Sequence, residues 1–382
     1  MQKNIFEKLI TKNFILKKYW RNIDKQILFG FTLLFILGVF FSFSSTSILA
    51  DERLDREYYS FFQKHLLYTI ASFCLMIFIS SINNDFINNT ILPGFLISFI
   101  LLAIVPLVGI EVKGAKRWLN LYFFNFQPIE FIKPFFILII AKIISSNKFK
   151  NLNFSHLVSF LILSLIVFFL IIQPDLGQSV LLTVTWLSLI FVSGMNIYFI
   201  FGLGLIVVLG FFSLIYFSPD KFDYILSRIS TFIDPSKGDG FQSQKAIDAI
   251  RLGGLKGQGM GEGVLKESVP EAHTDYIIAV ISEEFGSIIS ILIICIFLYI
   301  ALRLTKIIIS SNDNFYKLSL SGLVSLLIFQ TFIHIGVNAN LLPTTGMTLP
   351  FLSYGGSSLI SSGIVAGIIL NYTSLGVKKL NE

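Results

Sequence analysis

Charged side chains inside long apolar stretches are the residues of this sequence that could do chemistry. Glu130 and Lys133 stand three positions apart near the start of one such stretch, and Glu283 and Glu284 lie within another. A charge is expensive to place inside a bilayer, so each of these groups needs a partner or a function. On a helix, Glu130 and Lys133 would lie on neighbouring faces and could either neutralise each other as a structural pair or contact a polar substrate. For the two other glutamates we expect structural pairing with a basic residue or with His334.

Asp275 stands where a polar segment meets the apolar stretch that contains Glu283. A carboxylate at the start of a helix can take a proton from a hydroxyl group, and partial burial there makes it a stronger base. His273 and Thr274 directly precede it, so the same residues could instead cap the helix. No group of His or Cys residues in the sequence has the spacing of a transition-metal site.

The composition shows what kind of molecule must position these residues. Of the 382 residues, 54% are hydrophobic, only 14% are charged, and 41 are Phe. A soluble domain is typically about 25% charged. The composition therefore excludes a soluble enzyme, a disordered chain and a small disulfide-rich scaffold, and it indicates a protein that crosses a membrane several times. The net charge of +6 then reflects topology signals and lipid headgroup contacts rather than nucleic-acid binding. Cys74 and Cys295 lie in apolar runs and are expected to be packing residues.

Ten segments are candidates to cross a bilayer, whose core of about 30 Å needs about 20 helical residues. They are Ile27–Ala50, His65–Asn84, Phe86–Ile110, Pro128–Ile144, Leu152–Pro174, two within Leu176–Pro219, Tyr276–Leu302 and two within Leu318–Val377. We therefore expect an all-α integral membrane protein with ten transmembrane helices.

Basic residues set the expected orientation and domain plan. Residues 1–26 carry seven Lys or Arg, which predicts a cytoplasmic amino terminus under the positive-inside rule. The ten-helix domain then covers residues 27–377, with a large extracytoplasmic loop, residues 218–274, between the seventh and eighth helices. Residues 378–382 form a cytoplasmic tail. In this arrangement the polar loops converge on the outer face.

The large loop contains a glycine-rich segment, LGGLKGQGMGEGV, at 252–264. We reject a phosphate-binding loop, because no strand precedes the segment and no Lys-Ser or Lys-Thr pair follows its last glycine. We expect a mobile loop there. Upstream, FQSQKAIDAIRL at 241–252 places its apolar residues mostly on one side and predicts a short helix on the membrane surface.

Several motifs follow one another along the chain in an informative order. GAKRWLN at 114–120 and FQPIEFIK at 126–133 come first, then QPDLGQS at 173–179 and RISTFIDP at 228–235, and finally VPEAHTDYIIAVISEEFG at 269–286 and NANLLPTTGMTLPFLSYGGSS at 338–358. On a ten-helix pattern, this order resembles the SEDS family of cell-wall polymerases (shape, elongation, division and sporulation proteins) over nearly the whole chain. The segments PEAHTD and GQGMGEG look closer to the division branch, FtsW, than to the elongation branch, RodA.

The resemblance implies polymerisation of lipid II, a disaccharide-pentapeptide carried on undecaprenyl pyrophosphate. The donor would be the undecaprenyl-pyrophosphate-linked glycan chain, and the acceptor would be the 4-hydroxyl of the incoming sugar. One inverting displacement suffices, because an α bond is replaced by a β bond. A carboxylate base and cations that stabilise the departing pyrophosphate are the minimal requirement.

Asp275 matches the essential acidic position of the family and is the candidate catalytic base. The candidate substrate-binding residues are Lys133, Arg117 and Lys116 for the pyrophosphate, Glu130 to position Lys133 or hold a cation, Glu271 and His273 in the PEAHTD motif, and Ser357 and Ser358 after a glycine pair. Arg suits phosphate by its bidentate geometry and Lys as a point charge. A loosely bound Mg²⁺ or Mn²⁺ that bridges phosphates is compatible with such a site, and the resemblance implies no other cofactor.

The resemblance also implies a place and a partner. The place is the bacterial cytoplasmic membrane at the division site, and the partner is a class B penicillin-binding protein, an FtsI-like transpeptidase. Three alternatives stay open: a RodA-type elongation polymerase, a lipid II flippase, and a non-catalytic scaffold of the division machinery. Intramembrane charges suit a transport path. Against a transporter, the sequence lacks repeated halves with matching broken helices, and its polar motifs crowd the outer face.

Overall fold

The structure is a computed structural model that describes residues 23–46, 60–112, 115–121, 125–146, 152–195, 240–264 and 271–380, together with short pieces between 198 and 268. Its helices are α2 (Lys25–Thr46), α4 (Ser60–Ser81), α5 (Asn84–Val108), α6 (Pro128–Ser145), α7 (Leu152–Ile172), α8 (Leu176–Val192), α11 (Phe241–Gly253), α12 (Ile277–Phe285), α13 (Ser287–Ser310), α14 (Asn314–Asn338) and α15 (Gly356–Leu380). Three short strands are β1 (Ile110–Val112), β2 (Ala115–Asn120) and β3 (Asn125–Phe126).

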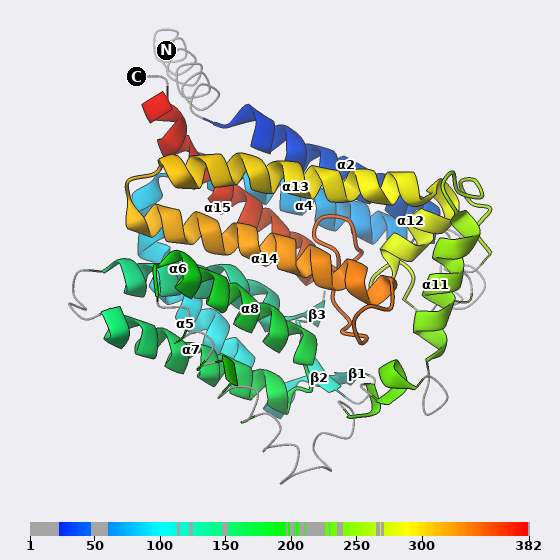
Figure 1. Cartoon of the computed structure of the whole chain (residues 1–382), viewed down its shortest axis with the longest axis horizontal. Coiled ribbons are helices and arrows are strands. Elements are labelled where there is room, and N and C mark those ends of the chain that lie inside the picture. The colour runs from blue at the N-terminus through cyan, green and yellow to red at the C-terminus, as the bar shows by residue number, and fades with distance from the viewer. Residues whose placement is uncertain are drawn as a thin grey trace, which may run out of the picture.

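The long helices form a bundle with two different ends. The amino-terminal end of α2 and the carboxyl-terminal end of α15 lie at one end, whereas α11, α12 and the strands lie at the other (Figure 1). Seven helices in the described part of the chain are long and apolar enough to cross a membrane: α2, α4, α5, α7, α13, α14 and α15. The chain is therefore a multi-pass membrane protein. Eight of the ten expected spans coincide with single described helices, the span expected over 276–302 is covered by two, and the one within 196–219 falls mostly on residues that the structure does not describe.

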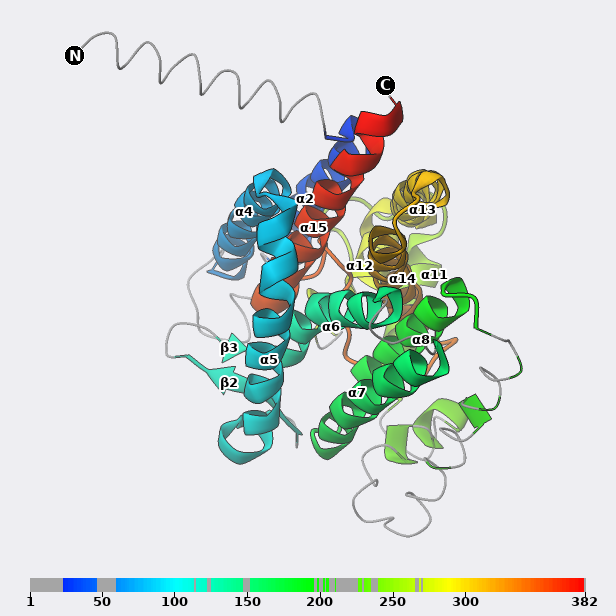
Figure 2. The ribbon, with the colours of Figure 1, turned by 90° about the vertical axis from the view of Figure 1, so that its left-hand side faces the viewer.

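Helix α6 lies at the centre of the bundle (Figure 2). It packs against α5, α7, α8, α14 and α15, and most of its residues are buried. Pro128 occupies the first helical position, where a missing backbone N–H costs nothing. Since α6 is enclosed by protein rather than lipid, its charged residues meet polar partners on neighbouring helices.

The expectation of an all-α fold is corrected by a three-stranded antiparallel sheet with the order β1-β2-β3. In its register, Glu111 of β1 faces Lys116 of β2, and Leu119 of β2 faces Phe126 of β3. The segment between α5 and α6 is too short for another helix pair. Antiparallel pairing satisfies its backbone hydrogen bonds where the chain passes from one helix to the next.

The single helix expected over 276–302 is wrong, because the chain breaks at Gly286 into α12 and α13. Gly286 has φ 84° and ψ 164°, a backbone conformation that residues with a Cβ rarely adopt. A Cβ at this position would also collide with the carbonyl oxygen of Leu255. The break lets α12 lie buried at the end of the bundle opposite the carboxyl-terminal end of α15, while α13 alone is long enough to span a membrane.

The glycine-rich segment 252–264 packs into this break, so the expected mobile loop is a docked one. The amide of Gln258 donates to the carbonyl of Glu283 (2.8 Å), and the amide of Gly259 donates to the carbonyl of Glu284 (3.0 Å). The Glu283 carboxylate accepts from the amide of Val264 (2.9 Å), and the Glu284 carboxylate accepts from the Ser44 hydroxyl. The loop thereby caps the carboxyl end of α12.

The short helix predicted over 241–252 is confirmed as α11, with Ala246 and Ala249 buried. It packs against α12 and runs across the direction of α13 and α14 (Figure 1). Its location on a membrane surface stays a prediction.

Candidate active site

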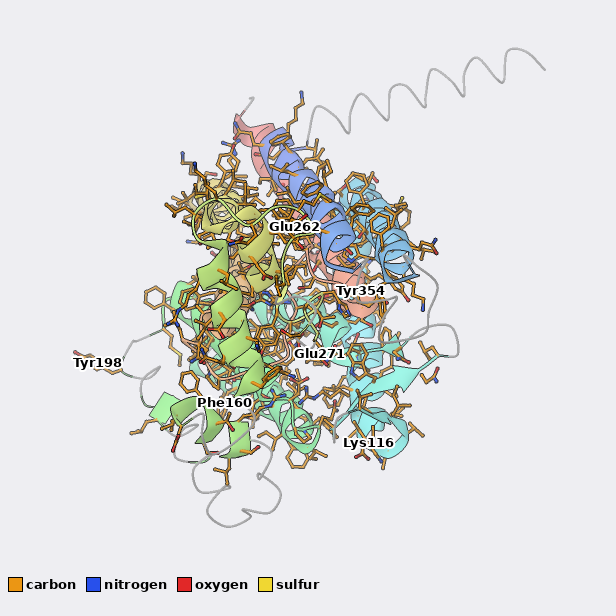
Figure 3. All side chains as sticks on the ribbon, turned by 90° about the vertical axis from the view of Figure 1, so that its right-hand side faces the viewer. Lys116, Phe160, Tyr198, Glu262, Glu271 and Tyr354 are labelled. Carbon is orange, nitrogen blue, oxygen red and sulfur yellow. The ribbon has the colours of Figure 1, made fainter. Side chains whose placement is uncertain are left out.

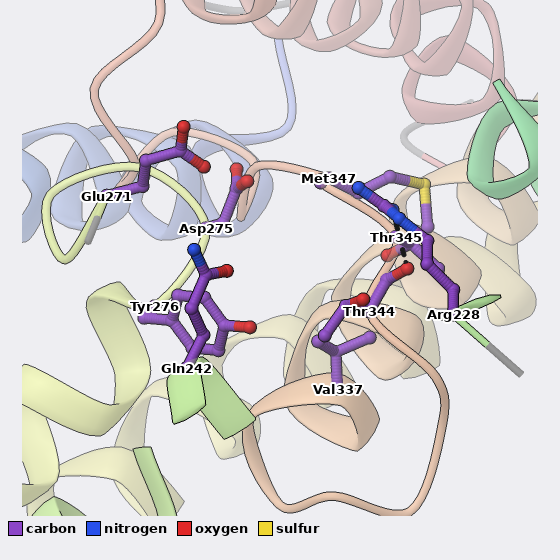
Figure 4. Close-up of a pocket in the computed structure, with 10 residues that line it drawn as sticks. Arg228, Gln242, Glu271, Asp275, Tyr276, Val337, Thr344, Thr345 and Met347 are labelled. Atoms are coloured by element: carbon purple, nitrogen blue, oxygen red, sulfur yellow. Dashed lines mark hydrogen bonds between the residues drawn. The ribbon is translucent and has the colours of Figure 1, made fainter. Parts of the chain in front are cut away.

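A cavity of about 160 Å³ lies beside Asp275 at the end of the bundle that carries α11 and α12. It is lined by Arg228, Gln242 of α11, the residues Glu271, Asp275 and Tyr276 before α12, Val337 of α14, and Thr344, Thr345, Gly346 and Met347 of the following loop. Figure 4 shows Glu271 and Asp275 on one side of this cavity and Arg228 on the other. Segments far apart in the sequence thus build one site.

A tight turn before α12 places the two carboxylates side by side. The carbonyl of Glu271 accepts from the amides of Thr274 (3.0 Å) and Asp275 (3.1 Å), and from the Thr274 hydroxyl (3.1 Å). Glu271 itself adopts a positive φ of 61°, an uncommon conformation for a residue with a side chain. The turn therefore presents Glu271 and Asp275, four positions apart, to the same cavity.

Arg117 approaches Asp275 across Gly346. A Cβ built on Gly346 would lie 3.5 Å from Asp275 Oδ2 and 3.9 Å from Arg117 Nη1, so carboxylate and guanidinium face the same glycine. Arg117 extends from β2 and is anchored on the turn before α8, where it donates to the carbonyls of Gln173 (3.2 Å) and Pro174. It also lies 3.9 Å from the Asp175 carboxylate. Burial raises the pKa of Asp175, and the positive charge of Arg117 opposes that rise.

Arg228 is the charged residue among the cavity residues that sequence reasoning missed. Its Nη1 donates to the carbonyl of Thr344 (2.7 Å), which holds the guanidinium at the cavity wall. The sequence feature that could have identified Arg228 is its position as the first residue of the motif RISTFIDP, to which no role was assigned.

Tyr276 lies beside Asp275 in the same cavity lining. Burial, and then the negative charge of Asp275, raise the pKa of Tyr276 to about 12, so its phenol is protonated at neutral pH.

Lys133 and Glu130 form a buried pair away from the cavity lining. Lys133 Nζ lies 2.8 Å from Glu130 Oε2, and the lysine is 1% exposed. Lys133 also donates to Gln330 Oε1 of α14 (3.3 Å), and Gln178 Nε2 of α8 donates to Glu130 Oε1 (3.0 Å). Both ions are therefore hydrogen-bonded by neighbouring helices. We call Glu130, Lys133, Gln178 and Gln330 the buried network.

Ser357 and Ser358 bind protein groups at the start of α15. Ser357 accepts from the amide of Gln127 (3.0 Å) and donates to the carbonyl of Asn125 (3.3 Å), which ties α15 to β3 and α6. The Ser358 hydroxyl lies 2.6 Å from that of Thr348. Neither serine lines the cavity beside Asp275.

His273 and Lys116 also lie apart from that cavity. The His273 ring packs against Phe61 and Tyr354, with centroids 5.2 and 5.7 Å away. Burial lowers the pKa of His273, with Glu271 opposing the change, so the ring is neutral at pH 7. Lys116 is exposed on β2 and projects at the periphery, away from Glu271 (Figure 3).

A metal ion at this site would have few protein ligands. In the described part of the chain, no three His, Cys, Asp or Glu residues gather closely enough to hold an ion. Glu271 and Asp275 line the same cavity as two carboxylates. That donor set fits Mg²⁺ or Mn²⁺ held by one or two carboxylates together with water and phosphate oxygens.

The sequence comparisons decide the family. The family model for FtsW, RodA and SpoVE, described as cell cycle protein, matches residues 25–375. The chain belongs to this family. A Caulobacter vibrioides protein named probable peptidoglycan glycosyltransferase FtsW is 34% identical over 352 residues, covering 92% of this chain and 89% of the relative. The stage V sporulation protein E of Bacillus subtilis is 36% identical over 348 residues, covering 89% of this chain and 93% of that protein. The resemblance seen in the motifs is thereby confirmed, including its FtsW-like character.

Solved structures share the fold. A chain from a structure entitled "Structural coordination of polymerization and crosslinking by a peptidoglycan synthase complex" matches with a TM-score of 0.74 and 23% identity, covering 93% of this chain and 98% of that one. The rod shape determining protein RodA of Thermus thermophilus matches with a TM-score of 0.68 and 23% identity, covering 92% and 96%. The family fold therefore extends over nearly the whole chain.

Proposed function

We propose that this protein is a peptidoglycan glycosyltransferase that polymerises lipid II at the outer face of the bacterial cytoplasmic membrane, in septal wall synthesis. The observation that carries the proposal is one cavity that joins the Asp275 carboxylate to the Arg228 guanidinium, with Arg117 across Gly346. The curated relatives named for this activity, about a third identical over nearly the whole chain, support the same conclusion.

In this mechanism Asp275 accepts the proton of the acceptor sugar's 4-hydroxyl. The hydroxyl oxygen attacks the anomeric carbon of the donor, the bond to pyrophosphate breaks, and the configuration inverts. The leaving pyrophosphate needs positive charge rather than a strong acid, and arginine supplies it with bidentate geometry. We assign that role to Arg228 and Arg117, because both guanidinium groups lie at or beside the cavity that Asp275 lines.

The size of the cavity limits what enters it. At about 160 Å³ it is smaller than the roughly 300–1,000 Å³ typical of ligand pockets. We therefore place only the reacting hydroxyl and the phosphates there, while peptide and polyprenyl tail lie outside. If Mg²⁺ or Mn²⁺ takes part, Glu271 and Asp275 would hold it, and it would neutralise phosphate charge.

We assign Lys133 and Glu130 a structural role in this proposal, because each already has a charged partner and an amide partner within the protein. The internal hydrogen bonds of Ser357 support the same assignment for it.

The orientation and partner are part of the proposal. We place the cavity end outside and both termini in the cytoplasm, since residues 1–26 carry seven Lys or Arg. A class B penicillin-binding protein is the proposed partner, because the fold matches a chain from a complex that coordinates polymerisation and cross-linking.

The deciding experiment measures glycan strands formed from lipid II by the purified protein together with an FtsI-like transpeptidase. We expect Asp275→Asn to reduce polymerisation by about 10²–10⁴-fold, the usual contribution of a general base, with unchanged thermal stability. Asp313→Asn is the matched control: Asp313 also precedes a helix, α14, where it accepts from the amides of Phe315 and Tyr316 at the helix end opposite Asn338.

Three results would contradict the proposal. Full activity of Asp275→Asn would show that Asp275 is not the catalytic base. Transfer of lipid II across vesicles without polymer would favour a flippase. Stimulation only by an elongation transpeptidase would place the protein in wall elongation rather than division.

A further inference from the structure

Three successive backbone carbonyls at the candidate base are held by one distant segment. The carbonyl of His273 accepts from the amide of Tyr354 (2.9 Å). The carbonyl of Thr274 accepts from the Ser353 hydroxyl (2.6 Å), and that of Asp275 accepts from Asn338 Nδ2 (3.0 Å). The three donors run from Asn338, the last residue of α14, to Tyr354, just before α15. We call residues 338–354 the final loop.

Asn338 joins the base to two helices. Its side chain is fully buried, and Nδ2 donates to the carbonyl of His334 (2.8 Å) as well as to that of Asp275. Its Oδ1 accepts from the amide of Ala279 (3.2 Å), in the first turn of α12. Tyr276, at the cap position of α12, makes no side-chain capping bond. Asn338 therefore supplies from α14 the acceptor that a capping side chain would normally provide.

Ser353 joins the same turn to the interior of the final loop. Its hydroxyl donates to Thr274 and accepts from the amide of Leu349 (2.8 Å), while its own amide donates to the carbonyl of Leu349 (3.1 Å). The serine is 1% exposed, so water does not replace these bonds at low cost. The bond to Thr274 thus fixes the chain immediately before Asp275.

The final loop also forms the wall that faces the base. Thr344, Thr345, Gly346 and Met347 line the cavity, and Gly346 lies opposite the Asp275 carboxylate. An Asp side chain has only two rotatable bonds, so its carboxylate moves with its backbone. One segment therefore sets both the position of the carboxylate and the surface against which a substrate would lie.

We propose that Asn338 and Ser353 are positioning residues, which hold the backbone of residues 274–275 so that the Asp275 carboxylate points into the cavity. The inference rests on the proposed function, since it assigns the base its support. A displacement of about 1 Å in a reacting group can cost about 10²-fold in rate, so hydrogen bonds of this kind matter to catalysis as well as to folding.

The first test uses Ser353→Ala in the lipid II polymerisation assay. We expect kcat to fall about 10-fold while KM changes less than about twofold, because the substrate contacts remain but the base shifts. Ser353→Thr keeps the hydroxyl and should restore most of the rate. Ser362→Ala is the matched control: this buried serine of α15 donates to the carbonyl of Ser358 in its own helix (2.9 Å) and should behave as the wild type.

The second test uses Asn338→Asp, which preserves the shape of the side chain and the acceptor for Ala279. It removes the donor to the carbonyls of Asp275 and His334 and places a carboxylate oxygen next to those carbonyl oxygens, which repel it. We expect kcat to fall about 10²-fold, more than for Ser353→Ala, since a repulsion between two oxygen atoms replaces the bond that holds the Asp275 carbonyl.

A double-mutant cycle separates positioning from a merely structural role. A residue that acts through Asp275 has nothing left to position in the Asp275→Asn background. Ser353→Ala and Asn338→Asp should then leave the residual rate of Asp275→Asn unchanged. If either lowers that residual rate by the same factor as in the wild type, or if both polymerise lipid II as the wild type does, the positioning role is overturned.

Should Asn338→Asp fail to fold, as judged by its melting profile in detergent, the cycle with Ser353→Ala and its Thr rescue decides alone. A wild-type protein that forms no polymer would instead overturn the proposed function, and that outcome is distinct from wild-type activity in the variants.

Discussion

Two groups of charged side chains, one inside the bundle and one at its end, differ in what surrounds them. The buried network holds Glu130 and Lys133 in direct contact, 2.8 Å apart, and two glutamine amides from other helices complete their hydrogen bonds. At the end of the bundle near α11, Asp275 and Arg228 line a cavity instead, and Figure 4 shows them on opposite sides of it. Glu130 and Lys133 are enclosed by protein, whereas Asp275 and Arg228 are only half-buried and border a cavity that could receive a substrate group.

The difference teaches that a buried charge by itself does not mark a reaction site. A paired ion whose partners are all protein groups stabilises one arrangement of the helices, and removing one member leaves an uncompensated charge. A carboxylate that borders a cavity, with its backbone held by a separate segment, can exchange a proton with a molecule in that cavity. Substitutions should therefore affect stability in the first group and turnover in the second.

The largest stability effect is expected for Lys133→Met. Glu130 would then be a buried carboxylate without its cation, at a cost of about 3–5 kcal/mol in the free energy of unfolding. The double variant Lys133→Met with Glu130→Gln should recover most of that loss, as measured by thermal unfolding in detergent. If Lys133→Met melts like the wild type but forms no polymer, Lys133 belongs to the substrate site. The contrast between a structural pair and a reaction site would then be wrong.

A smaller effect, on activity alone, is expected for Arg228→Met. Hydrogen bonds to charged groups are worth about 1.5–3 kcal/mol, so losing this cation should reduce polymerisation by roughly 10–100-fold with little change in melting temperature. Arg251→Met is the matched control, since Arg251 is an exposed arginine in the last turn of α11. Equal activity of the two variants would show that Arg228 does not contribute to the site.

The smallest effect is expected for Gly346→Ala. Its φ of 68° costs a residue with a Cβ about 1–2 kcal/mol, and the new methyl group would stand between Asp275 and Arg117. We expect a modest loss of stability together with a roughly tenfold loss of activity. Gly194→Ala separates the two effects, because Gly194 has φ 87° and nothing within 4 Å of an added Cβ. Identical activity losses in both variants would mean that strain alone acts.

Local features of the sequence predicted much of this molecule correctly. Apolar runs of about 20 residues indicate membrane helices wherever they occur, because burial in lipid depends on the run itself. The ordered motifs led to the family. Asp275 and Glu271 of PEAHTD line one cavity, while their roles stay predictions. The short helix α11 followed from the spacing of its apolar residues.

Other features depend on packing between distant segments, and only the tertiary structure decided them. Gly286 divides an apolar run into α12 and α13 because segment 252–264 packs against the break. Whether Lys133 faces a substrate or a partner depends on Gln178 and Gln330, which helix packing brings to it. Asn338 and Ser353 reach the backbone of Thr274 and Asp275, and Arg228 reaches the cavity, through the arrangement of loops at one end of the bundle. The length of an apolar run predicts most helices from their own residues, whereas the position of a hydrogen-bond donor to a few tenths of an ångström is set by every helix that packs around it.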